Sequence, residues 1–118
     1  MSYMFCNCNK LTELDLSYCK TDNVKCMKYM FYRCLKLTKL NLAFETGKVT
    51  DMSYMFCNCS ELNDLDLSSF KSDKVKYMQY MFFHCFKLTN LTLPSSFNTE
   101  KVENKTEMFF RFPYKKTN

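Results

Sequence analysis

The chain of 118 residues has one glycine, two prolines, one histidine and no tryptophan. With glycine so scarce, the fold cannot depend on many tight glycine turns, and the isolated Gly47 excludes a glycine-rich phosphate loop. No run of about 18 apolar residues occurs, so no segment is expected to insert into a membrane. The N-terminus also lacks the basic and apolar regions of a signal peptide.

Composition indicates one globular unit. Hydrophobic residues make up 47% of the chain, which is enough for a sizeable core. The net charge of +5 comes from 17 basic and 12 acidic residues, well short of the basic stripe typical of nucleic-acid binding.

The sequence repeats itself. The octapeptide MSYMFCNC at Met1 recurs letter for letter at Met52, and close variants begin at Met27 and Met78. These starts and a degraded one at Lys105 are spaced by 26, 25, 26 and 27 residues. We therefore expect a repeat array over residues 1–109, with units starting at 1, 27, 52, 78 and 105, and an irregular tail over 110–118. A double-length repeat is superimposed, because residues 1–42 and 52–93 match at 27 positions.

Each unit has two periodicities. Met27, Met30, Phe31 and Cys34 stand at i, i+3, i+4 and i+7, which predicts a short helix, and Asn23 and Asp51 stand where they would cap such helices. An alternating leucine pair then predicts a short strand with one buried face. The pairs are Leu14/Leu16, Leu40/Leu42, Leu65/Leu67 and Leu91/Leu93. One unit cannot bury its own apolar side, so stacking of units in register is expected.

The template V-x-x-M-x-x-M-F-x-x-C-x-x-L-x-x-L-x-L, carried for example by Val49 to Leu67, resembles the BspA-like leucine-rich repeat surface proteins. The fold expected is an α/β repeat solenoid: a leucine-rich-repeat-like stack of about four short-helix/short-strand coils with a parallel sheet on one face. The resemblance also implies a cell-surface or extracellular protein used for adhesion or protein binding, with a protein or glycan partner on another cell or matrix.

The eight cysteines are interpreted as structural. Cys8, Cys34, Cys59 and Cys85 share one inward slot, which predicts a ladder of free thiols, and Cys19 is expected to be a small buried hydrophobe. Cys6, Cys26 and Cys57 fall off the core positions. Zinc binding by the pairs Cys6/Cys8 and Cys57/Cys59 is the alternative, but pairs two coils apart lie at least ~9–10 Å from each other, too far for one ion. No metal or other cofactor is expected.

No catalytic residue is predicted, and the chain is expected not to be an enzyme. His84 takes a position that Arg33 and Asn58 hold in other units, so it is expected to be a solvated surface residue. A cysteine–histidine nucleophile also needs an orienting third group, and the sequence supplies none.

The outward strand positions form the predicted partner-binding surface, here called the strand face. Its residues are Glu13, Asp15, Lys39, Asn41, Asp64, Asp66, Asn90 and Thr92. Seven lysines gather instead in the loops before the predicted helices: Lys20, Lys25, Lys48, Lys71, Lys74, Lys76 and Lys101. Two interpretations stay open for these charges: simple solvation, or recognition of a polar partner by the strand face.

A row of tyrosines is the second candidate surface. Tyr3, Tyr29, Tyr54 and Tyr80 share one slot. The rings either stack between coils and seal the core edge, or form an aromatic patch for a second array or a glycan. Because lysines and tyrosines fall on different sides of the template, single-stranded nucleic acid is not expected as a partner.

The function predicted is a non-enzymatic interaction and adhesion module, and the alternative is a purely structural spacer with ligand binding elsewhere in the full-length protein. The repeat code starts mid-template at Met1 and is lost after Phe109, where Phe112, Pro113 and Lys115 break it. This pattern predicts self-association through open array ends.

Overall fold

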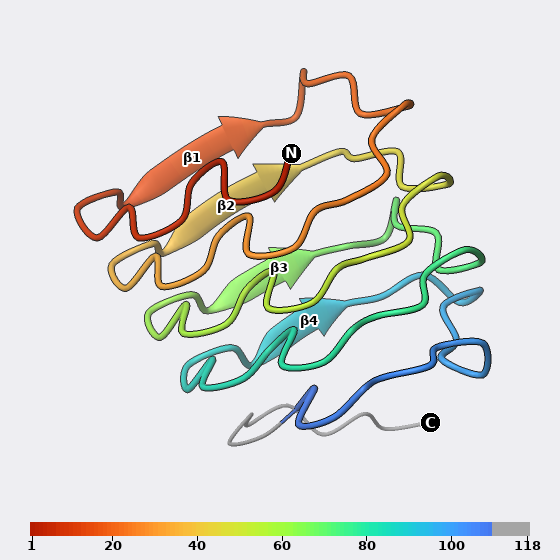
Figure 1. The fold of residues 1–118 in the computed structure, drawn as a ribbon. Coiled ribbons are helices and arrows are strands. Elements are labelled where there is room, and N and C mark those ends of the chain that lie inside the picture. Colours follow the sequence, from red (N-terminus) through yellow and green to blue (C-terminus); the bar gives the residue numbers. More distant parts are fainter. Residues whose placement is uncertain (110–118) are drawn as a thin grey trace.

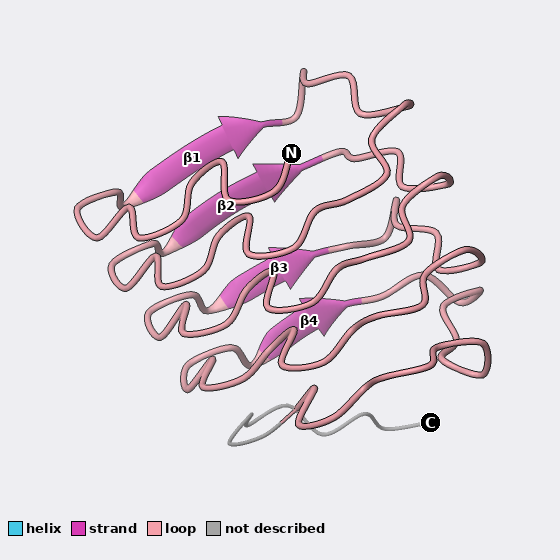
Figure 2. Cartoon of the chain, in the orientation of Figure 1, coloured by secondary structure: helices cyan, strands magenta, loops and turns pink. Residues whose placement is uncertain are grey.

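The structure is a computed structural model that describes residues 1–109. Its elements are four short strands: β1 (Glu13–Leu16), β2 (Lys39–Leu42), β3 (Asp64–Asp66) and β4 (Asn90–Thr92). Figures 1 and 2 show successive coils lying one on another, each contributing one strand to the same side. The prediction of a strand at each alternating leucine pair is confirmed. The predicted tail over 110–118 lies outside the described residues.

The strands are parallel but form two separate pairs. In the first, Glu13 lies opposite Lys39, and in the second Asp64 lies opposite Asn90. The expected single parallel sheet is therefore wrong for residues 1–109: β2 and β3 lie side by side (Figure 1) but share no ladder. The spacing also differs at this place, since 25 residues separate Lys39 from Asp64, against 26 within each pair. The double-length repeat of the sequence thus coincides with strand pairing.

On the opposite side of the coils the backbone pairing is continuous. Isolated parallel bridges join Cys26 to Asp51, Asp51 to Tyr77, and Tyr77 to Asn104. The N–H of Met27 donates to the Asp51 carbonyl, and the same bond recurs in the next coil from Met52 to the Tyr77 carbonyl. This side of the stack therefore holds the two strand pairs together.

The short helices predicted from the i, i+3, i+4, i+7 spacing are wrong: within residues 1–109 these segments are chains of turns. Alternate N–H groups point out of the turn and donate to carbonyls of the next coil. The Tyr29 N–H donates to the Ser53 carbonyl, and the Phe31 N–H donates to the Met55 carbonyl. A helix would direct those N–H groups to its own carbonyls instead. The spacing that resembles a helix face is produced here by turns whose apolar side chains all face inward.

The expected helix caps have other roles. The Asp51 carboxylate accepts from the N–H and the hydroxyl of Ser53, at 2.9 and 2.6 Å, and so closes a local turn. The Asn23 side-chain oxygen accepts from Lys48 Nζ at 2.9 Å in the next coil.

Left-handed backbone replaces glycine turns. Nine described residues other than glycine have φ between 53° and 62°. They are Tyr3, Asn7, Tyr29, Arg33, Tyr54, Asn58, Tyr80, His84 and Glu107. Such a conformation costs on the order of 1–2 kcal/mol per residue, and the bonds between coils offset it. The scarcity of glycine therefore does not prevent sharp turns; the chain forms them with ordinary residues at two fixed slots of the unit.

The core is a set of side-chain ladders running along the stack. The inward methionine, phenylalanine, cysteine and leucine slots are almost all buried in the central coils. Phe31, Phe56 and Phe82 stack ring on ring, with centroids 5.5 and 5.7 Å apart. Each coil thus buries its apolar side against its neighbours, as the repeat pattern predicted.

Candidate functional site

All eight strand-face residues are exposed, as expected from the alternation of leucines. Strand register brings them together in cross-coil pairs. Lys39 Nζ lies 3.5 Å from the Glu13 carboxylate, and the Asn90 amide donates to the Asp64 carboxylate at 2.6 Å. Both contacts lie inside a strand pair, so the polar pairing follows the two-coil period of the backbone.

Two strand-face carboxylates are fixed by the turn that follows their strand. Asp15 and Asp66 each accept a backbone N–H, from Ser17 and Ser68 respectively, at 2.9 Å. The serine bonds hold the pKa of both carboxyl groups below the usual range. These two carboxylates are therefore anionic and directionally fixed at neutral pH.

The strand face is acidic and shallowly hollowed. It carries four carboxylates against the single ammonium group of Lys39. One hollow of about 390 Å³ lies between β1 and β2, lined by Glu13, Leu14, Asp15, Lys39 and Asn41. Another of about 180 Å³ lies where the ladder is interrupted, lined by Thr38, Lys39, Leu40, Asn41, Asp64 and Asp66. The surface suits a partner that presents basic or hydrogen-bond-donating groups.

The four tyrosines form a continuous ladder, here called the tyrosine ladder. Neighbouring ring centroids lie 4.8, 4.6 and 4.8 Å apart, with interplanar angles of 6°, 6° and 11°. Tyr32 packs edge-on against Tyr29 and Tyr54, at 5.2 and 6.3 Å. Of the two interpretations of this row, the geometry is that of rings stacked between coils, and the ring faces between Tyr3 and Tyr80 are covered by one another.

The cysteine slot is a thiol ladder. Cys34 Sγ donates to the Phe5 carbonyl at 3.1 Å, Cys59 Sγ to the Phe31 carbonyl at 3.2 Å, and the bond recurs in the next coil. Each thiol thus bonds to the coil before it. Burial raises the pKa of Cys34 to about 11 and of Cys85 to about 12, so the thiols are un-ionised and poor nucleophiles at neutral pH.

Two cysteines differ from prediction. Cys19 was expected to be buried and is exposed; it lies in the first coil, beside the end of the ring stack that Phe44 and Phe70 form at 6.2 Å. Cys57 was placed off the core and is only 2% exposed. Its slot alternates between a cysteine and a large ring along the stack, as at Tyr32 and Phe83, so the small residue is covered by its larger neighbours. The alternation was visible in the sequence.

His84 is half-buried rather than fully solvated, which corrects the prediction. Its ring stacks on Phe83 at 3.8 Å and approaches Phe86 at 5.0 Å. Among residues 1–109, no group of three or more histidine, cysteine, aspartate or glutamate side chains is arranged to hold a metal ion. The described part of the chain also has no helix with the length and hydrophobicity that a membrane crossing requires.

The loop lysines are less uniform than the sequence pattern indicated. Lys71 lies 3.0 Å from Glu45 and Lys76 lies 4.0 Å from Glu103. A row of buried hydroxyls in the same loops was not predicted as a site: Thr46 Oγ1 donates to the Lys71 carbonyl at 2.8 Å and accepts the Lys71 N–H at 2.7 Å. The threonine-or-serine position of the template was the sequence feature that could have revealed this row.

Stacked coils of 25–27 residues, with ladders of identical side chains inside and polar rows outside, define a repeat protein. The chain matches over residues 1–118 the family described as "Mycoplasma protein of unknown function, DUF285", and it belongs to that family. Comparison with curated proteins and with solved structures gave no match.

Proposed function

We propose that this chain is a non-enzymatic binding module of a cell-surface repeat protein, a leucine-rich-repeat-like solenoid of the BspA-like type, and that it binds its partner on the strand face. The observation that supports this proposal is that all eight outward strand residues are exposed and that they include four carboxylates and one lysine. Net acidity on an exposed, ordered surface favours a partner with basic groups.

The buried thiols and the self-covered tyrosine ladder support a binding rather than a chemical role. Cys59 is fully buried and its thiol is bonded to a backbone carbonyl, so it offers no nucleophile to a substrate. The strand-face hollows are shallow and open, and they suit side chains of a macromolecule better than an enclosed small substrate.

The test is a screen of the folded chain against arrays of purified surface and matrix proteins, basic peptides and glycans. For any partner found, the triple variant Glu13→Gln/Asp64→Asn/Asp66→Asn should bind at least about tenfold more weakly. The matched control is Asp22→Asn/Asp73→Asn/Glu100→Gln, which removes the same charge from exposed loop positions. An equal loss in both triples would refute strand-face binding, and blank arrays with folded protein would favour the structural-spacer alternative.

A further inference from the structure

A row of lysines lies along the loop edge of the stack, here called the lysine row. Lys48, Lys74 and Lys101 occupy one slot in three successive coils, each directly before the inward valine. All three are exposed. Lys48 Nζ donates to Asn23 in the coil before it, whereas Lys74 and Lys101 make no ion pair or side-chain hydrogen bond with other residues of 1–109.

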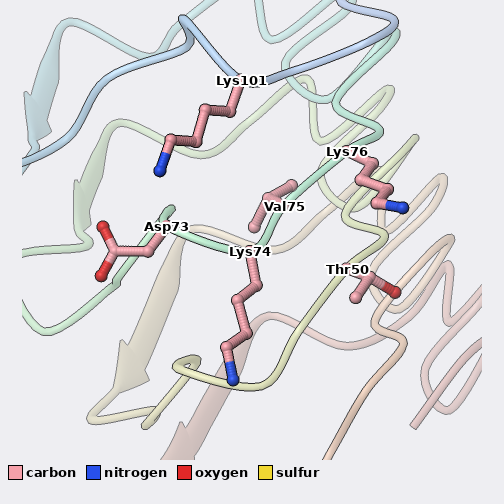
Figure 3. Close-up of a pocket in the computed structure, with 6 residues that line it drawn as sticks. All are labelled: Thr50, Asp73, Lys74, Val75, Lys76 and Lys101. Carbon is pink, nitrogen blue, oxygen red and sulfur yellow. The ribbon is translucent and has the colours of Figure 1, made fainter.

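The row borders a hollow of about 310 Å³, lined by Thr50, Asp73, Lys74, Val75, Lys76 and Lys101 (Figure 3). Figure 3 shows the side chains of Lys74 and Lys101 extending on the same side as Asp73, while Lys76 extends to the other side. The Asp73 carboxylate forms no ion pair with either of those lysines. Two ammonium groups that have no ion-pair partner among residues 1–109 therefore lie beside one opening.

The lysine row departs from how the rest of the chain arranges charge. Four ion pairs join residues of opposite sign in one slot of neighbouring coils: Lys39 with Glu13, Lys71 with Glu45, Lys76 with Glu103 and Lys87 with Glu61. Like charges at neighbouring register positions repel each other. Other slots also place like charges in neighbouring coils, as with Lys10 and Lys36 or Asp73 and Glu100, but within residues 1–109 only the lysine row repeats one charge through three successive coils.

We propose that the lysine row binds a linear sulfated polysaccharide. Parallel coils place successive lysines about 5 Å apart at their backbones, so three of them track roughly 10 Å of an extended polyanion. An array of ammonium groups binds sulfates through charge, with release of the polymer's counterions. The polymer runs along the stack, with sulfate groups at Lys74 and Lys101.

Single-stranded nucleic acid fits this edge less well. It needs ring faces on which bases stack, and the interior faces of the tyrosine ladder are covered by neighbouring tyrosines at 4.6–4.8 Å. The hollow beside the lysine row is lined by aliphatic and polar side chains, without an aromatic ring. This edge therefore offers charge to an anionic polymer but no ring surface on which nucleic-acid bases would stack.

The test is affinity for immobilised heparin over a series of salt concentrations. We expect Lys48→Gln/Lys74→Gln/Lys101→Gln to weaken binding about tenfold or more and to lower the slope of log affinity against log salt by about two to three. The matched control is Lys10→Gln/Lys28→Gln/Lys36→Gln, which removes the same charge from the turn side and should change affinity less than about threefold. Asp73→Asn should strengthen binding, because it removes the carboxylate from the same hollow.

Far-UV circular dichroism of each variant verifies that it is folded. Equal weakening in the two triple variants would overturn the proposal, since binding would then follow net charge alone. It would also be overturned if Asp73→Asn had no effect, or if the chain bound oligo(dT) or anionic phospholipid vesicles more tightly than heparin at equal salt.

Discussion

The thiol ladder predicts an unusual order of stability among Cys59 variants. Cys59 is fully buried, and its thiol donates to the Phe31 carbonyl at 3.2 Å. That carbonyl also accepts the Cys34 N–H at 3.2 Å, so it stays bonded when the thiol is removed. Cys59→Ala therefore loses mainly packing, about 1–3 kcal/mol for a small cavity in a core with little room to relax.

Cys59→Ser keeps a donor beside the same carbonyl. Burial of a hydroxyl without a partner would make serine the worse replacement. Because the Phe31 carbonyl is within reach, the hydrogen bond offsets most of that desolvation, and we expect Cys59→Ser to be at least as stable as Cys59→Ala.

Cys57 is the matched control. It is also buried, but its sulfur accepts from the Asn58 amide at 3.6 Å, and its thiol donates to no acceptor among residues 1–109. There, serine should be less stable than alanine by about 1 kcal/mol.

The measurement is urea unfolding followed by circular dichroism, with free energies compared at equal m-values. The quantity that decides is the serine-minus-alanine difference at position 59 minus the same difference at position 57. A value near zero would refute the role of the Phe31 carbonyl, because serine would then be tolerated or rejected by burial alone.

Three further predictions follow from the ladders. Tyr54→Phe should leave the free energy of unfolding nearly unchanged, whereas Tyr54→Ala should lower it by about 2–3 kcal/mol in urea unfolding. The reason is that the ring, stacked at 4.6 and 4.8 Å on its neighbours, makes the stabilising contact. Equal losses in the two variants would show that the hydroxyl makes it instead. Thr46→Val should lower the free energy of unfolding by about 2–4 kcal/mol, because it leaves both the N–H and the carbonyl of Lys71 without the threonine hydroxyl. Thr50→Val, whose hydroxyl makes one exposed bond, should lower it by about 1 kcal/mol. Similar losses in the two variants would contradict the bridging role of Thr46. The folded pKa of Cys34 is about 11 and that of Cys57 about 12, both above the ordinary 9.0. Thiols of the unfolded chain therefore ionise first, and the free energy of unfolding should fall as pH rises from about 9 toward 12. The decline, measured by urea unfolding, should be shallower in Cys57→Ala, and an unchanged slope would refute this origin.

The sequence alone determined most of the residues that face inward and where the strands lie. Identical side chains recur at fixed slots, and a stack of equal coils must place them in ladders, so the buried positions of Phe56, Cys59 and Leu65 follow from spacing. The exposure of the strand face follows from the same alternation. The repeat also predicted the stacked tyrosines as one of two interpretations.

Only the tertiary structure decided the backbone between those positions. An i, i+3, i+4, i+7 pattern is compatible with a helix and with a chain of turns; bonds to the next coil, such as that from Phe31 to the Met55 carbonyl, select the turns. Those bonds depend on a neighbour about 25 residues away, and local spacing does not report it. For the same reason, the partner of the Cys59 thiol, the burial of Cys57 and the break between β2 and β3 emerge only when the coils are stacked.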